Sequence, residues 1–199
     1  MKHLKKANQS MLLVLLIGLS IQALGQFQGK MVFKSMDKER HFDVHSCDAG
    51  YRYDFEEAGQ QGAVIVKSGT GEVIILMPQQ KMAMKSSASS PMGMTSDPLS
   101  SLEYYRQGGL LKEEGKEMVN GIECTKSTLW NKENPDQRMF TVWFSDKYNF
   151  PIKMVNHIDG EEDSGMEMRD IKPWVPDESL LSVPEGYQVM EMPAGAPGQ

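Results

Sequence analysis

Short apolar runs separated by turn residues predict a sheet-rich fold in the first half of the chain. The runs cover residues 63–67, 72–77 and 81–85, and the turns between them cover residues 68–71 and 78–80. Runs of this length that are bounded by Gly and Pro are typical of an antiparallel meander. The first two runs are apolar on both faces, whereas a strand with one face in water alternates between apolar and polar residues. We therefore expect cover on both sides of this sheet.

Alternating apolar and polar positions extend the sheet in both directions along the chain. The clearest turn is Asn120-Gly121, the dipeptide that most strongly indicates a two-residue hairpin. Residues 138–144 are again apolar on both faces, with Met139 and Trp143 sharing one of them. Further strands are expected at residues 27–36, 40–47, 51–55, 110–118, 122–130, 152–158 and 166–172, with one helical turn carrying Leu180 and Leu181 and a last short strand that ends at Met190.

Residues 86–101 differ from the rest because they are rich in Ser, Pro and Gly and poor in residues that pack. Such a composition predicts a mobile loop or lid on the surface. Residues 97–107 overlap the end of this segment and begin with a helix-start signal, Asp97-Pro98, which is followed by apolar residues at helical spacing. We expect a short amphipathic helix there that ends at the pair Gly108-Gly109.

The chain opens with a segment that predicts export. Residues 1–25 combine three Lys and no acid with an apolar core at residues 11–18 and small residues before Gln26. This is the pattern of a cleaved secretory signal peptide, and an uncleaved anchor is the other interpretation. The residue after the expected cut is Gln rather than the Cys that a bacterial lipoprotein needs. We expect one β domain at residues 26–192, a disordered tail at residues 193–199, and a protein that is soluble in the periplasm or outside the cell.

Charge narrows the range of partners. The chain has 21 basic and 27 acidic residues, and the leader holds three of the basic ones and no acidic one, so the mature chain has 18 against 27 and a net charge of −9. Nucleic-acid binding needs basic clusters, and an anionic membrane surface repels such a chain. After the leader, no run is long and apolar enough for a transmembrane helix. We therefore expect no nucleic-acid partner and no membrane-spanning segment in the mature protein.

The motifs of common catalytic sites are missing from the sequence. It contains no G-x-S-x-G, and the Gly-containing segment at residues 68–71 fits a hairpin turn better than a phosphate-binding loop. We therefore expect no catalytic residues and no cofactor, and a protein that is not an enzyme.

Two cysteines, Cys47 and Cys124, remain after the leader. In an exported protein they could form a disulfide, which would close a long loop. Two separate buried thiols that act as small hydrophobic residues are the other interpretation. The sequence leaves both open, because nothing in it shows that the two residues meet.

Methionine is the compositional outlier, with 16 residues in the chain and 14 after the leader. Four pairs have the spacing Met-x-Met, which places both thioethers on one face of a strand. Thioether sulfur suits Cu(I), and the pairs could form a copper site; the other interpretation is that Met fills irregular cores and adaptable binding surfaces. The pairs are Met82/Met84, Met92/Met94, Met166/Met168 and Met190/Met192, and the copper candidates are the first two.

Four stretches carry a resemblance to a known family: EVIILMPQQKMAMK at residues 72–85, VNGIECT at 119–125, TVWFSDKYNFPIK at 141–153 and IKPWVPDESLLSVPEGY at 171–187. In order and spacing they resemble an exported bacterial family, domain of unknown function 4412, which is similar in pattern to the lipoprotein carriers LolA and LolB. The resemblance implies an incomplete, strongly curved antiparallel β-barrel whose concave face is covered by short helices and a loop. In the carriers this face holds acyl chains. The basic residue that the lipoprotein carrier uses to hand on its cargo has no match in this chain.

Together these features predict a mainly β (α+β) protein with a curved antiparallel sheet that forms an incomplete β-barrel. We expect it to bind an apolar ligand, a lipid or acyl chain, without transforming it, beneath a lid formed by residues 86–101 and the helix after them. Copper handling and a structural role with a protein partner in the cell envelope stay open as other functions. The expected ligand contacts are Met77, Met82, Met84, Met92, Met94, Trp143 and Met154.

Overall fold

The computed structural model of the chain describes residues 25–35, 38–158 and 164–192, and for residues 94–96, 98 and 101 it describes the backbone alone. Apart from Gly25, the expected leader and tail lie outside the described residues. Within the part of the chain that the structure describes, no helix has the length and apolar character needed to span a bilayer.

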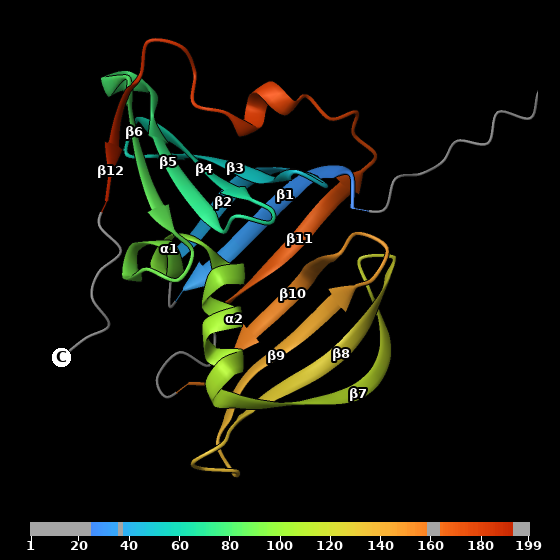
Figure 1. Cartoon of the computed structure of the whole chain (residues 1–199). Helices are drawn as coiled ribbons and strands as arrows, with labels where there is room; N and C mark the ends of the chain where they lie inside the picture. The colour runs from blue at the N-terminus through green and yellow to red at the C-terminus, as the bar shows by residue number, and fades with distance from the viewer. Residues whose placement is uncertain (1–24, 36–37, 159–163, 193–199) are drawn as a thin grey trace, which may run out of the picture.

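In these described residues, twelve β-strands form one open sheet (Figure 1). The strand order is β12-β6-β5-β4-β3-β2-β1-β11-β10-β9-β8-β7, and the neighbours are antiparallel except β12, which runs parallel to β6. This architecture confirms the expected fold class, a mainly β protein with a curved sheet that does not close and with short helices. The strands are β1 (Phe27–Ser35), β2 (Lys38–Cys47), β3 (Gly50–Glu57), β4 (Gln60–Lys67), β5 (Glu72–Met77), β6 (Met82–Ser87), β7 (Gly109–Val119), β8 (Ile122–Asn131), β9 (Arg138–Ser145), β10 (Phe150–Asn156), β11 (Gly165–Lys172) and β12 (Gln188–Glu191).

Two meanders, β1 to β6 and β7 to β11, meet in the middle of the sheet where β1 pairs with β11. Met31 lies opposite Met168 in this pairing, and Phe33 lies opposite Met166. The first and the eleventh strands of the domain are therefore neighbours, although most of the chain separates them in sequence.

The hairpin between β7 and β8 forms where the sequence predicts it. Asn120 and Gly121 have φ angles of 50° and 78°. These left-handed values at both central positions are those of the two-residue turn that Asn-Gly favours, because they match the twist of the flanking strands. The prediction of this hairpin is confirmed.

One face of the sheet, called the inner face below, carries α1 (Pro91–Ser96) and α2 (Pro98–Gly108); Figure 1 shows both helices on this side. Side chains that alternate along the strands form the main core on this face. Its fully buried members come from both meanders, and burying them is the principal favourable contribution to folding. They include Phe27, Met31, Val44, Tyr53, Val64, Val73, Leu129, Ile152, Met166 and Met168.

The opposite face, called the outer face below, is covered over β4 to β6 by residues 174–187. This segment contains the short helix η2 (Glu178–Leu181) and runs on to β12 (Figure 1). Leu181 is buried in one cluster with Ile65 and Leu76, two residues that point away from the inner face. The expected cover is therefore confirmed on the outer face of this meander.

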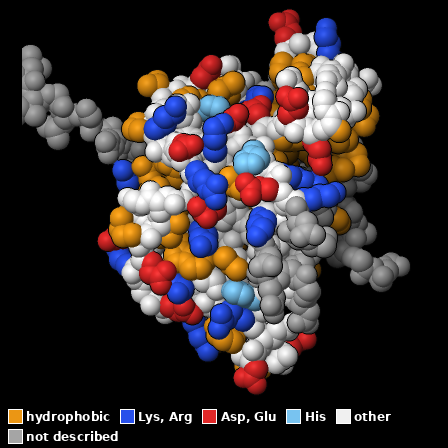
Figure 2. Space-filling model, turned by 180° about the vertical axis from the view of Figure 1, so that it is seen from behind, with side chains coloured by type: hydrophobic (Ala, Val, Ile, Leu, Met, Phe, Trp, Pro, Cys, Tyr) orange, Lys and Arg blue, Asp and Glu red, His pale blue; other side chains and the backbone are white. Residues whose placement is uncertain are grey.

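The outer face of the remaining strands carries ion pairs between neighbouring strands. Lys30 Nζ lies 2.8 Å from Asp43 Oδ1, and Lys126 Nζ lies 3.0 Å from Glu117 Oε1. Figure 2, which views the molecule from behind, shows basic and acidic side chains interspersed. Such a mixture is typical of a solvated surface.

The segment before α2 contains more regular structure than the sequence predicts. Residues 91–96 form α1 because Ser90 Oγ accepts a hydrogen bond from the backbone N–H of Gly93 at 3.0 Å, as in a helix N-cap. A Cβ on Gly93 would lie 2.1 Å from the carbonyl oxygen of Ser87, so glycine alone lets α1 pack this closely against the end of β6. The prediction of a loop at residues 86–101 is therefore wrong at α1, whereas the helix expected at residues 97–107 is confirmed by α2.

Candidate functional site

An open cleft of about 650 Å³ lies on the inner face of β1 to β5. A volume of this size is typical of small-molecule sites. Period-two alternation places the lining side chains on one face, since Met31 pairs with Phe42 and Tyr53 pairs with Val64 across neighbouring strands. The apolar floor consists of Met31, Phe33, Phe42, Tyr53, Phe55, Val64 and Ile75.

Aromatic rings make up most of this floor. Phe42 contacts Tyr53 and Phe55 edge to face, with ring centroids 5.7 Å and 6.2 Å apart. Phe33, Phe42 and Phe55 are only half buried, so part of each ring stays accessible from the cleft. Aromatic surface that is gathered in one place and left in contact with water favours the binding of an apolar molecule.

The ring of Phe55 lies against the backbone of Gly62, its partner on β4. A Cβ at position 62 would lie 2.3 Å from Phe55 Cζ, which is closer than any real side chain allows. Glycine is therefore required at this position for the ring to lie flat on the sheet.

Charged residues of both signs surround the mouth of the cleft. Arg40 Nη2 lies 3.5 Å from Glu57 Oε1, and His41 Nε2 lies 3.3 Å from Glu39 Oε1. The cleft therefore combines an apolar floor with a polar rim, the arrangement expected for a molecule that has an apolar part and a polar part. The rim consists of Lys38, Glu39, Arg40 and His41 from the start of β2 and Glu56 and Glu57 from the end of β3.

Beside the cleft, Asp97 fixes α2 to the inner face. It is the N-cap of α2, and its carboxylate accepts hydrogen bonds from the backbone N–H groups of Leu99 and Ser100. The hydroxyl of Tyr51, on β3, donates to the same carboxylate at 2.7 Å. Asp97 is only 1% exposed, so these donors take the place of water around its charge.

Burial dominates the acid–base behaviour of this group of residues. The pKa of Asp97 is raised because burial outweighs the hydrogen bonds from Ser100 and Tyr51. The pKa values of Tyr51 and Tyr53 are raised well above the usual tyrosine value, first by burial and then by the nearby charge of Asp97. Both tyrosines are therefore neutral in the physiological range.

Tyr53 reaches from the cleft to the space beneath α2. Besides the cleft it lines a small cavity of about 10 Å³ that Met31, Asp97 and Leu99 also border. The hydroxyl of Tyr53 is buried, and it has no hydrogen-bond partner among the described residues. Tyr53 is thus shared between the cleft and the small cavity beneath the first turn of α2.

Three of the expected ligand contacts, Met77, Met82 and Met84, share the inner face at the edge of the first meander. Met77 pairs with Met82, and Met84 pairs with Ile75, a residue of the cleft floor. All three methionines are half buried, and none of them lines the cleft itself. The structure therefore places them next to the cleft rather than in it.

Met154 and Trp143 lie on opposite faces of the sheet. Met154 is buried on the inner face, opposite Met166. Trp143 pairs with Lys153 on the outer face, and its indole N–H donates to Glu117 Oε2 at 2.7 Å. A ligand in the cleft does not reach Trp143, because the sheet itself lies between them.

The remaining methionine candidates belong to α1, which packs against β6. Met92 is half buried there, and for Met94 the structure describes the backbone alone. Copper binding by Met82, Met84, Met92 and Met94 stays a prediction. Among the described residues, no group of three or more His, Cys, Asp and Glu side chains could hold a metal ion.

Cys47 and Cys124 are both buried and free, so the disulfide interpretation is wrong. Cys47 belongs to the cluster beneath η2 on the outer face, whereas Cys124 belongs to the main core cluster. Burial raises the pKa of the Cys124 thiol to about 11. Each cysteine therefore acts as a small hydrophobic residue.

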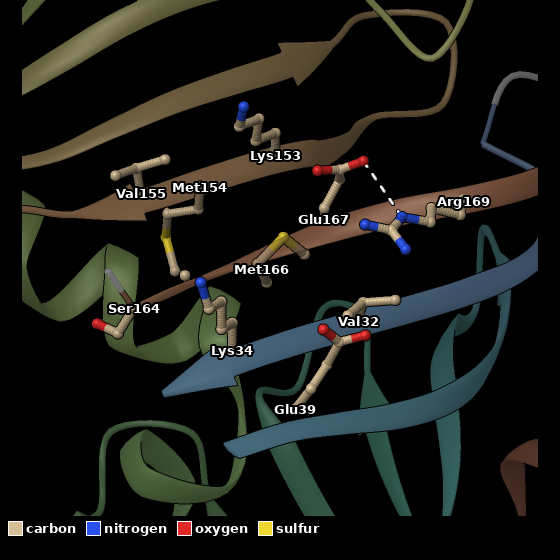
Figure 3. A pocket seen from close by; sticks show the side chains of 11 residues that line it. Val32, Lys34, Glu39, Lys153, Met154, Val155, Ser164, Met166, Glu167 and Arg169 are labelled. Atoms are coloured by element: carbon tan, nitrogen blue, oxygen red, sulfur yellow. Dashed lines mark hydrogen bonds and ion pairs between the residues drawn. The ribbon is translucent and has the colours of Figure 1, made fainter. Parts of the chain in front are cut away.

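A second pocket, of about 270 Å³, lies at β1, β10 and β11 (Figure 3). Its lining includes Lys34, Lys153 and Arg169, and Arg169 Nε lies 3.3 Å from Glu167 Oε1. Figure 3 shows these charged side chains around it, with Met154 on β10 nearby. The cleft is larger and has the more apolar lining, so it is the better candidate for an apolar ligand.

The aromatic floor of the cleft was missed by the sequence-based prediction, which assigned the ligand to six methionines and Trp143. Phe42, Tyr53 and Phe55 each occupy the apolar side of an alternating strand, the same position that core residues occupy. Alternation could have placed each on an apolar face. It could not have shown that this stretch of the face lacks a covering helix.

No family model matches the chain, and no curated protein matches it in sequence. Solved structures do match in shape. An uncharacterized conserved protein from Thermus thermophilus is similar with a TM-score of 0.57 and 12% identity, over 86% of this chain and 93% of that chain. At this identity the likeness concerns the fold alone.

Two further structures are similar at lower scores. The complex of Pseudomonas aeruginosa MucA and MucB matches with a TM-score of 0.44 and 13% identity, over 83% of this chain and 58% of that chain. A LolA superfamily protein from Nitrosomonas europaea matches with a TM-score of 0.41 and 10% identity, over 81% of this chain and 91% of that chain. These two TM-scores are too low to support an inference about function.

Proposed function

We propose that this chain is an exported, non-enzymatic binding protein that holds an apolar ligand, a lipid or acyl chain, in the inner-face cleft. The observation that carries this proposal is the cleft itself, an open space of about 650 Å³ over half-buried aromatic rings. Each methylene group moved from water onto such a surface contributes about 0.8 kcal/mol. A chain of several methylenes therefore binds without a buried polar anchor.

Met77, Met82 and Met84 extend the apolar surface from the cleft towards the edge of the sheet. They share its face, and Met84 is the direct neighbour of Ile75 in the floor. Methionine is unbranched and polarizable, so it adapts to ligands of different shape. These residues would contact the part of a long chain that extends beyond Phe55 and Val64.

The buried carboxyl group of the inner face has a structural role. Asp97 accepts hydrogen bonds from the first turn of α2 and from Tyr51, and it is buried beneath that helix. Its donors are those of a helix cap rather than those of a substrate. We therefore assign it to holding α2 in place and propose no catalytic step.

Export and family membership complete the proposal. The leader at residues 1–25 and the four stretches that resemble the exported family support them, and the curved, open sheet agrees with the fold that this resemblance implies. Mass spectrometry of the exported protein would test the leader. A mature chain that begins at Gln26 supports cleavage, and a chain that retains residues 1–25 contradicts it.

Titration with a fatty acid that carries an environment-sensitive fluorophore tests the cleft. The wild-type protein should bind the probe saturably, and Phe42→Ala and Phe55→Ala should each weaken binding, with the fold checked by circular dichroism. Leu111→Ala removes a similarly apolar but exposed side chain on β7 and should leave binding unchanged. Saturable binding that is indifferent to Phe42 and Phe55, or no saturable binding, would contradict the proposal.

A second candidate function, binding a protein of the cell envelope, is favoured by the edge strand β7. Leu110, Leu111 and Met118 are exposed along it, and its outer backbone edge pairs with no described strand. An edge of this kind can pair with a strand of another chain. Cross-linking in the host envelope, compared between the wild type and Leu110→Lys, would reveal a partner that depends on this edge.

A further inference from the structure

The mouth of the cleft presents one cation and one anion that face each other across two strands. Arg40, on β2, and Glu57, on β3, lie 3.5 Å apart. They continue the register in which Asp43 lies opposite Asp54. Both side chains border the cleft.

The pair belongs to the ligand side of the sheet. Arg40 is two residues from Phe42, and Glu57 is two residues from Phe55, so strand alternation places all four on the inner face. The rings form the floor and the charges form the rim. A ligand chain that lies on the rings therefore ends beside both charges.

A charged group of a ligand can replace either member of the Arg40–Glu57 ion pair. Its side chains are 54% and 61% exposed, and an ion pair this exposed is only weakly stabilising. A ligand group that replaces one member of the pair therefore costs the protein little. At the same rim, Lys38 provides one more positive charge, and Glu39 and Glu56 provide two more negative charges.

We propose that the ligand is a zwitterionic amphiphile, with one negative and one positive charge in its headgroup and an apolar chain on the aromatic floor. This inference rests on the proposed function of the cleft. The negative group would pair with Arg40 and Lys38, and the positive group with Glu57 and Glu56. A headgroup with a single charge would leave one member of the Arg40–Glu57 pair without a partner, whereas a zwitterion satisfies both.

Three probes with one fluorescent acyl chain and different headgroups test this inference on the mature protein at low ionic strength. The headgroups are phosphocholine, carboxylate and trimethylammonium. The phosphocholine probe should bind about fivefold more tightly than either singly charged probe, the effect of one additional exposed ion pair. Equal affinities, or a preference for a singly charged probe, would overturn the zwitterion.

Two neutral variants show whether both charges take part. Arg40→Gln and Glu57→Gln should each weaken phosphocholine binding about fivefold, and Glu57→Gln should at the same time strengthen carboxylate binding. Lys30→Gln and Asp43→Asn are the matched controls, because that pair has similar exposure but lies on the outer face. They should change none of the three affinities.

The outcomes separate the inference from the function on which it rests. If all three probes bind saturably and the headgroup makes no difference, the cleft keeps its function and the zwitterion is wrong. If only Arg40→Gln weakens phosphocholine binding, the ligand is anionic. If only Glu57→Gln weakens it, the ligand is cationic. If no probe binds saturably, both the inference and the proposed function fail.

Discussion

The hydroxyl of Tyr51 donates a hydrogen bond to the buried carboxylate of Asp97 at 2.7 Å, and this contact ties α2 to the sheet. Tyr51→Phe removes the donor and leaves the carboxylate buried with fewer partners. We expect the free energy of unfolding to fall by about 1–3 kcal/mol. Urea denaturation measures this loss of unfolding free energy. Tyr104→Phe is the control, because Tyr104 is an exposed tyrosine of α2; an equal loss in both variants would contradict the role of the contact.

Asp97 should make stability depend on pH in a particular direction. Its pKa in the folded protein lies above the usual value of 3.8, so the folded state binds the proton more tightly than the unfolded state does. The contribution to stability is therefore fully present below about pH 3.8 and is lost as pH rises through the folded pKa. Asp97→Asn removes this titration.

The difference in unfolding free energy between the wild type and Asp97→Asn measures this contribution when it is followed as a function of pH. It should decline as pH rises above about 3.8 and then become constant. A difference that grows with pH would show that the hydrogen bonds of Asp97 outweigh its burial.

A side chain at position 62 should displace the ring of Phe55. Gly62→Ala places a Cβ 2.3 Å from Phe55 Cζ, so the ring must move or the strands must separate. We expect a loss of about 1–3 kcal/mol in unfolding free energy, as for other overpacked sites. Thermal and urea denaturation measure it. Gly108→Ala is the matched control because a Cβ there meets no atom within 4 Å; its stability should stay within about 1 kcal/mol of the wild type.

The cover of the outer face should contribute strongly to stability. Leu181 is 1% exposed in the cluster beneath η2. Leu181→Ala should therefore lower the free energy of unfolding by about 2–5 kcal/mol, the usual range for a buried leucine. Leu110→Ala, at an exposed position of β7, should change it by less than about 0.5 kcal/mol. Similar losses in both variants would mean that residues 174–187 do not pack as described.

The two cysteines should be unreactive in the folded protein and free when it unfolds. Both are buried, and the raised pKa of Cys124, about 11, keeps its thiol protonated at neutral pH. A thiol reagent should label neither in native buffer and both in denaturant without a reductant. Label incorporation measured by mass spectrometry checks this. If both cysteines stay unlabelled in denaturant, the interpretation that they form a disulfide would be correct.

The local sequence pattern was sufficient to predict the strands. Alternation and turn residues act within a few positions, and β5 forms at Glu72–Met77, the range that its apolar run predicts. Local pattern could not predict pairing between strands that are distant in sequence, because nothing near β1 identifies β11 as its neighbour. The helix α1 was missed because its cap at Ser90 lies in a Ser-rich stretch where many residues could cap.

The candidate site was less predictable than the fold. Alternation indicates which residues share a face, but it does not indicate which face is inner. Trp143 belongs to the outer face, and Met154 on the next strand belongs to the inner one. The position of α2 on the same face also depends on a contact between distant residues, the hydrogen bond from Tyr51 to Asp97. Phe42 and Phe55 are therefore recognised as a site only in the folded chain.

The pairing of β1 with β11 has a consequence for how the chain is made. The first strand to emerge during synthesis finds its partner on one side, β2, almost at once, whereas its other partner follows only with residues 165–172. Contacts this distant in sequence form slowly, because a long loop must close first. Until then one backbone edge of β1 stays unpaired, and this is the period in which newly made chains can pair with one another instead.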